Sequence, residues 1–299
     1  MKIPKLSIVI LSHNTKQVLS DCLNSLSQVR GEVDFEAIVS DNGSTDGTIE
    51  AIKEKFDWVK LVDNDKNLGF AAGNNKAKPY TQGEYILFLN PDTIVPKSTL
   101  KETVKYLDDN SNLGALTCKI VLPNGKLDKD ARRSFPTPWV ALTHLILRLD
   151  RIVPHSRILA KYWYGYINED TAHEVDALQG AFFLVRKRVL DEVGWFDEDY
   201  FLDGEDIDLC WRIKAAGWKI MYFPKVNITH IKGVSKGKGL HALSVEKDKR
   251  LHFRATGVSS MEIFYRKHMW EKYPLALNLL VVLGIRLVKL YRTIGVYFK

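Results

Sequence analysis

The 299-residue sequence contains only three cysteines, Cys22, Cys118 and Cys210, which lie far apart in the chain. Three cysteines without a CxxC pair exclude a disulfide framework, argue against a zinc site and favour a reducing compartment. Residues 1–5 lead directly into a strand-like run, so we do not expect a signal peptide. The sequence therefore predicts a cytoplasmic protein.

Internal repeats, low-complexity tracts and long hydrophobic segments are also missing. The apolar stretch at residues 273–285 has 13 uncharged residues, which as a helix would span about 20 Å. A bilayer core needs ~20 apolar residues, so this stretch does not predict a transmembrane helix. With 45% hydrophobic, 26% charged and 11% aromatic residues, the composition is that of a globular protein with a substantial core.

A net positive charge is missing from the first part of the chain and is found only in the last quarter. Residues 231–299 carry 14 Lys and Arg against 4 Asp and Glu, a net charge of +10, whereas residues 1–230 carry −3. This step predicts an acidic globular part followed by a segment that meets phosphates, on nucleic acid or on an anionic membrane surface. A solvated pair of basic helices explains the same composition.

Three cations in the C-terminal segment, Arg286, Lys289 and Arg292, recur every three residues with apolar residues between them. The pattern suits a helix in a lipid interface, where long cationic side chains reach the headgroups. A helix that packs its apolar side on the globular part has the same pattern, and the sequence leaves both interpretations open. We interpret residues 231–299 as a basic, partly amphipathic helical extension.

Short apolar runs alternate with helix-like stretches through the first third of the chain. Four of these runs are strand-like, at residues 6–11, 35–39, 58–62 and 85–89. The alternation predicts an α/β fold with a mainly parallel sheet flanked by helices, because parallel strands need crossover connections. We further expect strands at residues 114–122, 181–185 and 218–223, a helix at 206–216, and an insertion at 124–175 with a helix near 139–149.

Ligands of parallel sheets bind at the carboxyl ends of the strands, so the residues after each run are informative. Asp41 ends the second run and opens a turn rich in Gly, Ser and Asp. It either forms that turn or accepts a hydrogen bond from a nucleobase or ribose. After the third run, Gly69 and Gly73 permit either close helix packing or the approach of a diphosphate to backbone N–H groups.

Two further strand ends carry residues that could bind a cation. Asp92, in the sequence Asn90-Pro-Asp, is placed to bind Mg²⁺ or Mn²⁺, although an Asp in a proline turn has the same sequence. His230 follows the last strand-like residues and is either a structural residue or a further ligand.

Four acidic residues, Asp203, Glu205, Asp206 and Asp208, gather where a later helix is expected to begin. Carboxylates at a helix N-terminus are stabilised by the helix dipole, so capping explains some of them. A general base that deprotonates a substrate hydroxyl, or a nearby metal ion, would account for the rest.

Six motifs in these positions resemble those of family 2 glycosyltransferases of the GT-A fold, and among them the bacterial rhamnosyltransferase-like members. The motifs come in the family's order and span residues 5–230. The matching stretches are residues 7–15, 41–48, 67–74, 87–92, 180–183 and 204–208. The resemblance implies a GT-A catalytic domain at residues 1–230, with the insertion at 124–175 on the acceptor side.

The resemblance implies transfer of a sugar from a nucleoside diphosphate to an acceptor hydroxyl, with inversion of the anomeric centre. By position, Asp41 would hold the base and Asp92 the metal ion on the diphosphate. Asp206 would be the general base, with Glu205 as the second choice. His230 would be an additional metal or diphosphate contact. The expected cofactor is a divalent cation, Mg²⁺ or Mn²⁺.

The other expected site residues form two groups. Those expected around the nucleotide sugar, with Asp41, are Ser12, His13, Asn14, Asn42, Gly43, Asn67, Gly69, Asn74 and Asn90. Those considered for the acceptor or its phosphates are Arg132, Arg133, Gln179, Gly180, Asp203, Arg254 and Lys267. We expect a glycan or polyprenyl-diphosphate-linked acceptor, and peripheral attachment to the inner face of the cell membrane through the C-terminal segment. Homo-oligomer formation stays open.

The metal motif differs from the family's common Asp-x-Asp, because Asn90 stands at its first position. Rhamnosyltransferase-like members tend to have Asn-Pro-Asp, which favours dTDP-rhamnose as the donor in the synthesis of a cell-surface polysaccharide. A UDP-hexose, UDP-GlcNAc or galactofuranose donor is the alternative.

Two other classes of protein explain less of the sequence. A Rossmann dehydrogenase or methyltransferase would need Gly-x-Gly-x-x-Gly after the first strand, where Ser12-His-Asn-Thr stands instead. A non-enzymatic nucleic-acid binder would need base-stacking or groove-reading elements, and the basic extension has an apolar run in their place. Neither class accounts for the acids at positions 92 and 206, so we do not expect nucleic acid as a partner.

Overall fold

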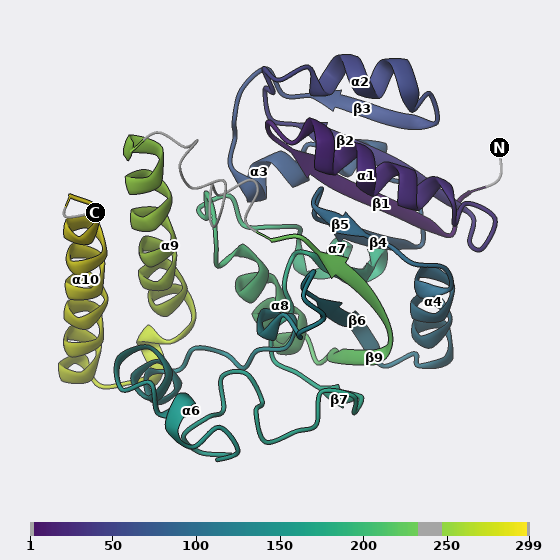
Figure 1. The fold of residues 1–299 in the computed structure, drawn as a ribbon. Coiled ribbons are helices and arrows are strands. Elements are labelled where there is room, and N and C mark those ends of the chain that lie inside the picture. Colours follow the sequence, from purple (N-terminus) through teal and green to yellow (C-terminus); the bar gives the residue numbers. More distant parts are fainter. Residues whose placement is uncertain (1–2, 233–246, 298–299) are drawn as a thin grey trace.

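The computed structural model describes residues 3–232 and 247–297, with side chains for 3–232 and 256–293, and shows a mixed β-sheet flanked by helices (Figure 1). Its nine strands have the order β3-β2-β1-β4-β8-β6-β9-β5, and β7 pairs with β9. The strands are β1 (Leu6–Ser12), β2 (Phe35–Asp41), β3 (Val59–Asp63), β4 (Tyr85–Leu89), β5 (Thr93–Ile94), β6 (Leu113–Val121), β7 (His173–Glu174), β8 (Phe182–Arg186) and β9 (Lys219–His230).

The sheet is parallel from β3 through β2 and β1 to β4, and mixed beyond β4. β8 runs antiparallel to both β4 and β6, while β9 runs parallel to β6. The expected α/β fold is confirmed, but the parallel arrangement holds only for the N-terminal half. An apolar run shows that a strand is buried and does not show in which direction it runs. In register, Ser12 lies opposite Asp41 and Asp41 opposite Asp63, so these strands end at one edge of the sheet.

Most helices form where the sequence predicts them. α1 buries Leu19, Cys22, Leu23 and Leu26, which share one helix face. The predicted helix near 139–149 is instead split into α5, a π-helical turn and α6, and Arg148 has a left-handed backbone (φ 52°) before α6. The helices are α1 (Lys16–Ser27), α2 (Thr48–Lys55), α3 (Phe70–Asn75), α4 (Thr99–Asp109), α5 (Pro138–Ala141), η3 (Leu142–Ile146), α6 (Leu149–Ile152), α7 (Lys187–Val193), α8 (Glu205–Ala215), α9 (Lys247–His268) and α10 (Leu275–Tyr297).

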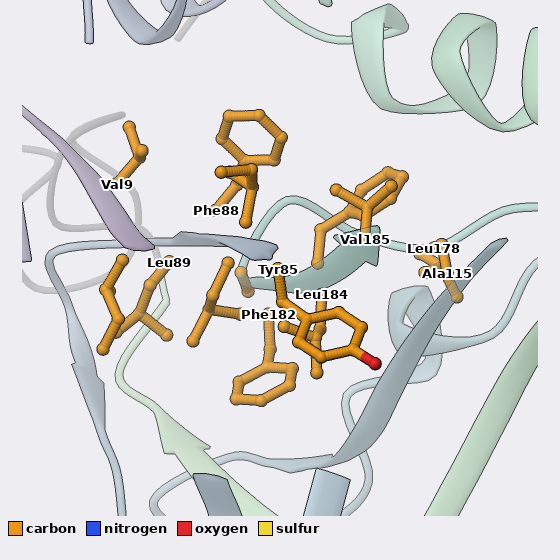
Figure 2. Packing of buried hydrophobic residues seen from close by; sticks show 14 of the residues in the cluster. Val9, Tyr85, Phe88, Leu89, Ala115, Leu178, Phe182, Leu184 and Val185 are labelled. Atoms are coloured by element: carbon orange, nitrogen blue, oxygen red, sulfur yellow. The ribbon is translucent and has the colours of Figure 1, made fainter. Parts of the chain in front are cut away.

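The main core lies where β4 and β8 pair in the middle of the sheet (Figure 2). Every residue of both strands is buried, including Phe88, Phe182 and Leu184, which have no exposed surface. Strands covered on both faces are expected to be continuous apolar runs, as these are. Because each large apolar side chain contributes ~1.5–3 kcal/mol on burial, this core gives a rigid base to the loops that follow β4 and precede β8.

A second, smaller core joins the C-terminal helices to the rest of the chain. Tyr200, Phe264, Tyr265, Met269 and Val282 are buried together in it. α9 and α10 lie side by side (Figure 1), and the Tyr265 hydroxyl donates to Asn278 Oδ1 over 2.6 Å between them. One face of this helix pair therefore packs on the globular part, as one of the two interpretations of the sequence predicts.

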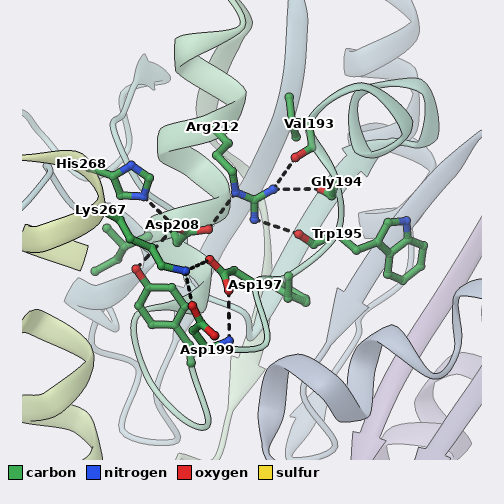
Figure 3. Close-up of polar contacts among 12 residues, drawn as sticks. Val193, Gly194, Trp195, Asp197, Asp199, Asp208, Arg212, Lys267 and His268 are labelled. Atoms are coloured by element: carbon green, nitrogen blue, oxygen red, sulfur yellow. Dashed lines mark hydrogen bonds and ion pairs between the residues drawn. The ribbon is translucent and has the colours of Figure 1, made fainter. Parts of the chain in front are cut away.

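Hydrogen bonds to the buried carboxylate of Asp208 connect α9 to α8 (Figure 3). Asp208 of α8 accepts hydrogen bonds from Arg212 over 2.8 Å and from His268 of α9 over 2.6 Å. Burial raises the pKa of Asp208, but these two partners outweigh it and hold the pKa below its usual range. Arg212 also donates to the carbonyl oxygens of residues 193–195, so the network ties three segments together.

Candidate active site

A cavity of about 330 Å³ opens at the carboxyl ends of β1, β2 and β4, opposite the N-terminus of α8. The structure brings thirteen of the expected site residues to its walls. They are His13, Asn42, Asn67, Gly69, Asn90, Asp92, Arg133, Gln179, Gly180, Asp203, Glu205, Asp206 and His230. We call this space the first cavity.

Hydrogen bonds between the loops after β1 and β2 shape one wall of the first cavity. His13 Nδ1 lies 2.8 Å from the carbonyl oxygen of Asn42 and donates to it. Asn42, which is buried, donates from Nδ2 to the carbonyl oxygen of Gly69 over 3.0 Å. Through Asn42, these bonds connect the His13 ring to the backbone at Gly69, and all three residues line the cavity.

Several expected residues support this wall from behind and do not line the cavity. Asp41 is buried, and its two carboxylate oxygens accept from the Ser44 N–H and hydroxyl, each over 2.7 Å. Asn14 accepts from the Thr45 N–H over 2.7 Å and so joins the two loops. The others in this position are Ser12, Gly43 and Asn74.

Gly69 allows two distant segments to meet at the cavity. Its φ of +85° is in the left-handed region that favours glycine, and a Cβ there would lie 2.5 Å from the carbonyl oxygen of Phe201. That same carbonyl accepts from the Phe70 N–H over 2.7 Å. The close approach places the loop before α8 against the start of α3, and so closes the cavity on one side.

Asn90, Asp92 and His230 meet at the end of β4, as predicted. His230 Nε2 lies 3.3 Å from Asp92 Oδ1 and 3.5 Å from Asn90 Nδ2. The opposite ring nitrogen, Nδ1, lies 3.1 Å from Asp128 Oδ2. Burial lowers the pKa of His230, but the hydrogen bonds and charges of Asp128 and Asp92 outweigh it and raise the pKa to about 9.

The partners of His230 in the insertion were not predicted from the sequence. Lys232 donates to Asp128 Oδ1 over 2.7 Å and to Asp130 Oδ2 over 2.8 Å. Burial raises the pKa of Asp128, yet hydrogen bonds from His230 and Lys232 bring it down to about 2. Lys232 follows the end of β9, and this position after a strand is the signal in the sequence that points to it.

The expected general base, Asp206, forms a buried ion pair. Arg133 Nη2 donates to Asp206 Oδ2 over 2.6 Å, and the other carboxylate oxygen accepts from the Ile207 N–H over 2.8 Å. Burial lowers the pKa of Arg133, but the charge of Asp206 outweighs it and raises the pKa above its usual range. Asp206 stands in the first turn of α8 after Gly204, whose φ is +94°, and the helix dipole favours a carboxylate there.

A second cavity, of about 210 Å³, lies on the other side of this ion pair. Arg133, Asp203 and Asp206 line both cavities. The remaining walls of the second cavity are largely apolar and come from the insertion and the C-terminal helices. They include Pro136, Val140, Ala141, His144, Leu145 and Tyr162, and from α9 and α10 Gly257, Ser260, Met261, Phe264 and Arg292.

Two expected acceptor residues, Arg132 and Lys267, do not line either cavity. Arg132 is buried and donates to the carbonyl oxygens of Ile167 and Asn168. Lys267 forms ion pairs with Asp197 and Asp199, on the side of α9 shown in Figure 3. The side chain of Arg254 lies outside the described part of the chain.

Apolar lining residues also escaped the sequence analysis. Phe70 and Phe201 line the first cavity together with Leu11, Pro91 and Leu202. Phe70 packs edge-on against Phe196, with ring centroids 5.6 Å apart. An aromatic residue at such a position looks like any core residue in the sequence, because the cavity that it lines forms only where the loop at residues 201–203 meets the start of α3.

Residues 7–194 match the family model for glycosyl transferase family 2, which covers more than half of the chain. The protein belongs to glycosyl transferase family 2. It is therefore a glycosyltransferase, and the predicted family resemblance is confirmed. The match ends before α8, so the carboxylates at 205 and 206 and the walls of the second cavity that come from α8, α9 and α10 lie beyond it.

Two curated relatives are similar to this glycosyltransferase over most of its length. One is an N-acetylglucosaminyl-diphospho-decaprenol L-rhamnosyltransferase of Mycobacterium tuberculosis, 27% identical over 294 residues, with 94% of this chain and 91% of the relative covered. The other is rhamnosyltransferase WbbL of Escherichia coli K12, 27% identical over 231 residues, with 75% of this chain and 82% of the relative covered.

Solved structures with similar folds are GT-A glycosyltransferases, which confirms the fold. The mannosyltransferase PcManGT of Pyrobaculum calidifontis, in complex with GDP-Man and Mn²⁺, has a TM-score of 0.58 at 19% identity, over 87% of this chain and 65% of that one. Staphylococcus aureus TarS 1–349 with UDP-GlcNAc has a TM-score of 0.52 at 19% identity, over 86% of this chain and 66% of that one.

The side chains around Asp92 fit a divalent cation only if the substrate supplies some of its ligands. Within the described residues, no group of three or more His, Cys, Asp or Glu side chains could hold a metal ion. Asp92 and Asn90 offer oxygen ligands beside one another, both close to His230. Mg²⁺ and Mn²⁺ accept such a set when one carboxylate and the substrate's phosphate oxygens share the ion. The donor set therefore fits a cation that is bound together with a diphosphate.

Proposed function

We propose that this protein is an inverting glycosyltransferase that moves L-rhamnose from dTDP-rhamnose onto a hydroxyl of a polyprenyl-diphosphate-linked saccharide, in the synthesis of a cell-surface polysaccharide. The names of the two rhamnosyltransferase relatives support the donor sugar, and that of the mycobacterial one supports the acceptor. The Asn-Pro-Asp motif at residues 90–92 also supports a rhamnose donor. A UDP-linked sugar is the alternative donor, since TarS 1–349, of similar fold, has been solved with UDP-GlcNAc.

The observation that carries the proposal is the position of Asp206 between two cavities. The first cavity has polar side chains among its walls at the strand ends, where α/β sheets bind nucleotides. The second has mostly apolar walls, to which the ion pair of Arg133 and Asp206 adds charge. Asp203 and Arg292 are its other charged lining residues. A donor in the first cavity and an acceptor in the second would meet at Asp206. A base at this position can take the proton from the acceptor hydroxyl while that oxygen attacks the donor.

On the donor side, the residues after β1, β2 and β4 would enclose the nucleotide sugar. His13 and Asn42 would line the nucleoside end, while Asp41 holds the loop that carries Asn42 through its bonds to Ser44. Asp92, with Asn90, would hold the divalent cation and the diphosphate. A bound divalent cation would neutralise charge on the departing diphosphate.

The chemical step needs one proton acceptor. Asp206 would take the proton from the acceptor hydroxyl as that oxygen forms a bond to the anomeric carbon of the donor. The bond from this carbon to the diphosphate oxygen would break on the opposite face, and the electron pair would leave with the nucleoside diphosphate. Arg133 would orient the Asp206 carboxylate through the 2.6 Å hydrogen bond. A single displacement of this kind inverts the anomeric centre.

A lipid-linked acceptor requires the enzyme to work at a membrane surface. No helix among the described residues is long and apolar enough to cross a membrane. The net charge of +10 at residues 231–299 supports attachment to anionic lipid through the C-terminal segment. We propose that the enzyme is peripheral on the inner face of the cell membrane.

The decisive test compares two neighbouring carboxylates at the start of α8. Asp206→Asn should abolish transfer to a synthetic lipid-diphosphate saccharide and leave the Kd of dTDP-rhamnose, measured by calorimetry, within about twofold of wild type. Glu205→Gln is the matched control and should retain measurable transfer. Wild-type turnover by Asp206→Asn, or loss of transfer only in Glu205→Gln, would reject Asp206 as the base.

The donor is tested separately by thermal shift. A ligand that binds only the folded protein raises Tm, so dTDP-rhamnose with Mn²⁺ should raise it more than UDP-GlcNAc or a UDP-hexose. A larger shift with a UDP-sugar would keep the glycosyltransferase proposal and reject the rhamnose donor.

A further inference from the structure

The insertion carries an unusual number of exposed large apolar side chains. In the segment from Trp139 to Ile158, seven of them are exposed to solvent, with Ile152 at 73% and Ile158 at 67%. Folded proteins seldom leave so many large side chains in water without a partner. The seven residues are Trp139, Leu142, Ile146, Leu147, Ile152, Val153 and Ile158. The described part of the chain has no element that covers them.

The charges around this segment have one sign. Arg148, Arg151 and Arg157 are exposed between the apolar residues. The only acidic residue of the segment, Asp150, is turned inward and lies 3.3 Å from His144. The exposed surface of the segment is therefore apolar and cationic, which is the combination that anionic lipid headgroups and acyl chains attract.

The outward face of α10 has the same character. Leu279, Leu283, Leu287 and Tyr291 recur every four residues on the side away from α9, and each is more than half exposed. The opposite side of α10 packs on α9 through Val282. Residues 275–297 contain no acidic residue, so α10 also pairs an apolar face only with cations.

The two surfaces border the same cavity. Val140, Ala141, His144 and Leu145 of the insertion form one wall of the second cavity, and Arg292 of α10 contributes to another. A membrane that touched both surfaces would lie next to the space that we assign to the acceptor.

We propose that residues 139–158 and the outward face of α10 form one lipid-binding surface that seats the second cavity on an anionic bilayer. The insertion is thus a second membrane contact beside the C-terminal segment. The role of the surface in catalysis rests on the proposed function, but its binding to lipid does not, because vesicles need neither donor nor acceptor.

A second copy of the chain fits this surface less well than lipid does. In a symmetric dimer, a patch meets its own copy, so the cations of one subunit would face those of the other. Arg148, Arg151 and Arg157 have no exposed acidic residue of the segment to pair with across such an interface. Lipid phosphates supply the missing negative charge.

The test is co-sedimentation at low salt with vesicles of phosphatidylglycerol and phosphatidylcholine in equal parts, and with phosphatidylcholine alone. Wild type should bind the anionic vesicles. The triple variant Ile146→Asn, Ile152→Asn, Ile158→Asn should bind them with an affinity at least about tenfold lower, because three apolar side chains no longer enter the interface. The matched control, Ile3→Asn with Tyr80→Asn, alters exposed apolar residues elsewhere and should bind like wild type.

Trp139 gives a second, direct measurement. Brominated phosphatidylcholine in the anionic vesicles should quench part of the tryptophan fluorescence of wild type, and Trp139→Phe should lose that part. Wild-type binding by the triple variant, or no quenching that depends on Trp139, would overturn the proposal. Light scattering that shows a dimer in wild type and a monomer in the triple variant would also overturn it. A donor-induced rise in Tm, measured on each variant, tests the nucleotide-sugar site independently.

Discussion

Arg133 Nη2 and Asp206 Oδ2 lie 2.6 Å apart in a buried ion pair that separates the two cavities. Replacing the cation leaves a buried carboxylate without its counter-charge, which typically costs about 3–5 kcal/mol. We expect Arg133→Met to lower the free energy of unfolding in urea by about that amount. At the same concentration of folded protein, the variant should also have a kcat lower by about tenfold or more, because the carboxylate loses its orientation.

Arg132→Met is the matched control for that prediction. Arg132 is also buried, but it donates to backbone carbonyl oxygens and lies over the Tyr222 ring, away from both cavities. Its replacement should cost stability and leave kcat of the folded fraction close to wild type. Equal losses of kcat in both variants would show that the Arg133 effect is structural only.

The position of Gly69 predicts a steric effect on the first cavity. Gly69→Ala would place a methyl group 2.5 Å from the carbonyl oxygen of Phe201, in a left-handed conformation. Gly125→Ala is the control, because Gly125 also has a positive φ (+77°) but no atom within 4 Å of its Cβ position. Gly125→Ala should cost about 1–2 kcal/mol of unfolding free energy. Gly69→Ala should cost more and should weaken donor binding in calorimetry, whereas equal effects would contradict the close approach.

The pair of Asp92 and Asn90 predicts dependence on a divalent cation. Transfer should stop in excess EDTA and return with Mn²⁺ or Mg²⁺. Asp92→Asn should raise the Mn²⁺ concentration needed for half-maximal transfer by about tenfold or more, because a carboxylate ligand is lost. Asp130→Asn, which alters another acid of the first cavity that pairs with Lys232, should leave that concentration near wild type. Undiminished transfer in EDTA would exclude the cation.

The buried carboxylate of Asp208 predicts a pH dependence of stability. Its pKa is lowered in the folded state by His268 and Arg212 despite burial, so its contribution is present above the ordinary value of 3.8 and disappears as pH falls through the folded value. Asp208→Asn should therefore lower the free energy of unfolding at pH 7, and its difference from wild type should shrink below pH 3.8. A difference that stays constant with pH would show that charge is not the cause.

Features that depend on neighbouring residues were predicted from the sequence, and features that depend on distant contacts were not. Residues that directly follow a strand, such as His13 and Asn90, were placed correctly because strand ends meet at one edge of the sheet. The start of α8, where Asp206 stands, was predicted because a cluster of acids before an apolar-periodic stretch is visible in the sequence. The antiparallel direction of β8 was not predictable, since both directions bury the same side chains.

Features that depend on distant contacts escaped the sequence analysis. The pairing of Lys232 with Asp128 joins residues 104 positions apart, and no spacing rule connects them. The second cavity was not foreseen for the same reason, because its walls come from the insertion and from α9 and α10. The charge step at residue 231 did predict a separate C-terminal element, but not that this element would help to enclose a cavity.

Apart from Arg133, Asp203 and Asp206, which the two cavities share, their walls come from different residues. The strand-end loops of the first lie within residues 11–92, whereas much of the second comes from residues 136–145 and from the C-terminal helices. On the proposed assignment, recombination within a gene could replace the acceptor-side stretches and leave the donor-side stretches as they were. A new acceptor specificity could then evolve while the donor site stays unchanged. A chimeric enzyme could be designed by the same exchange.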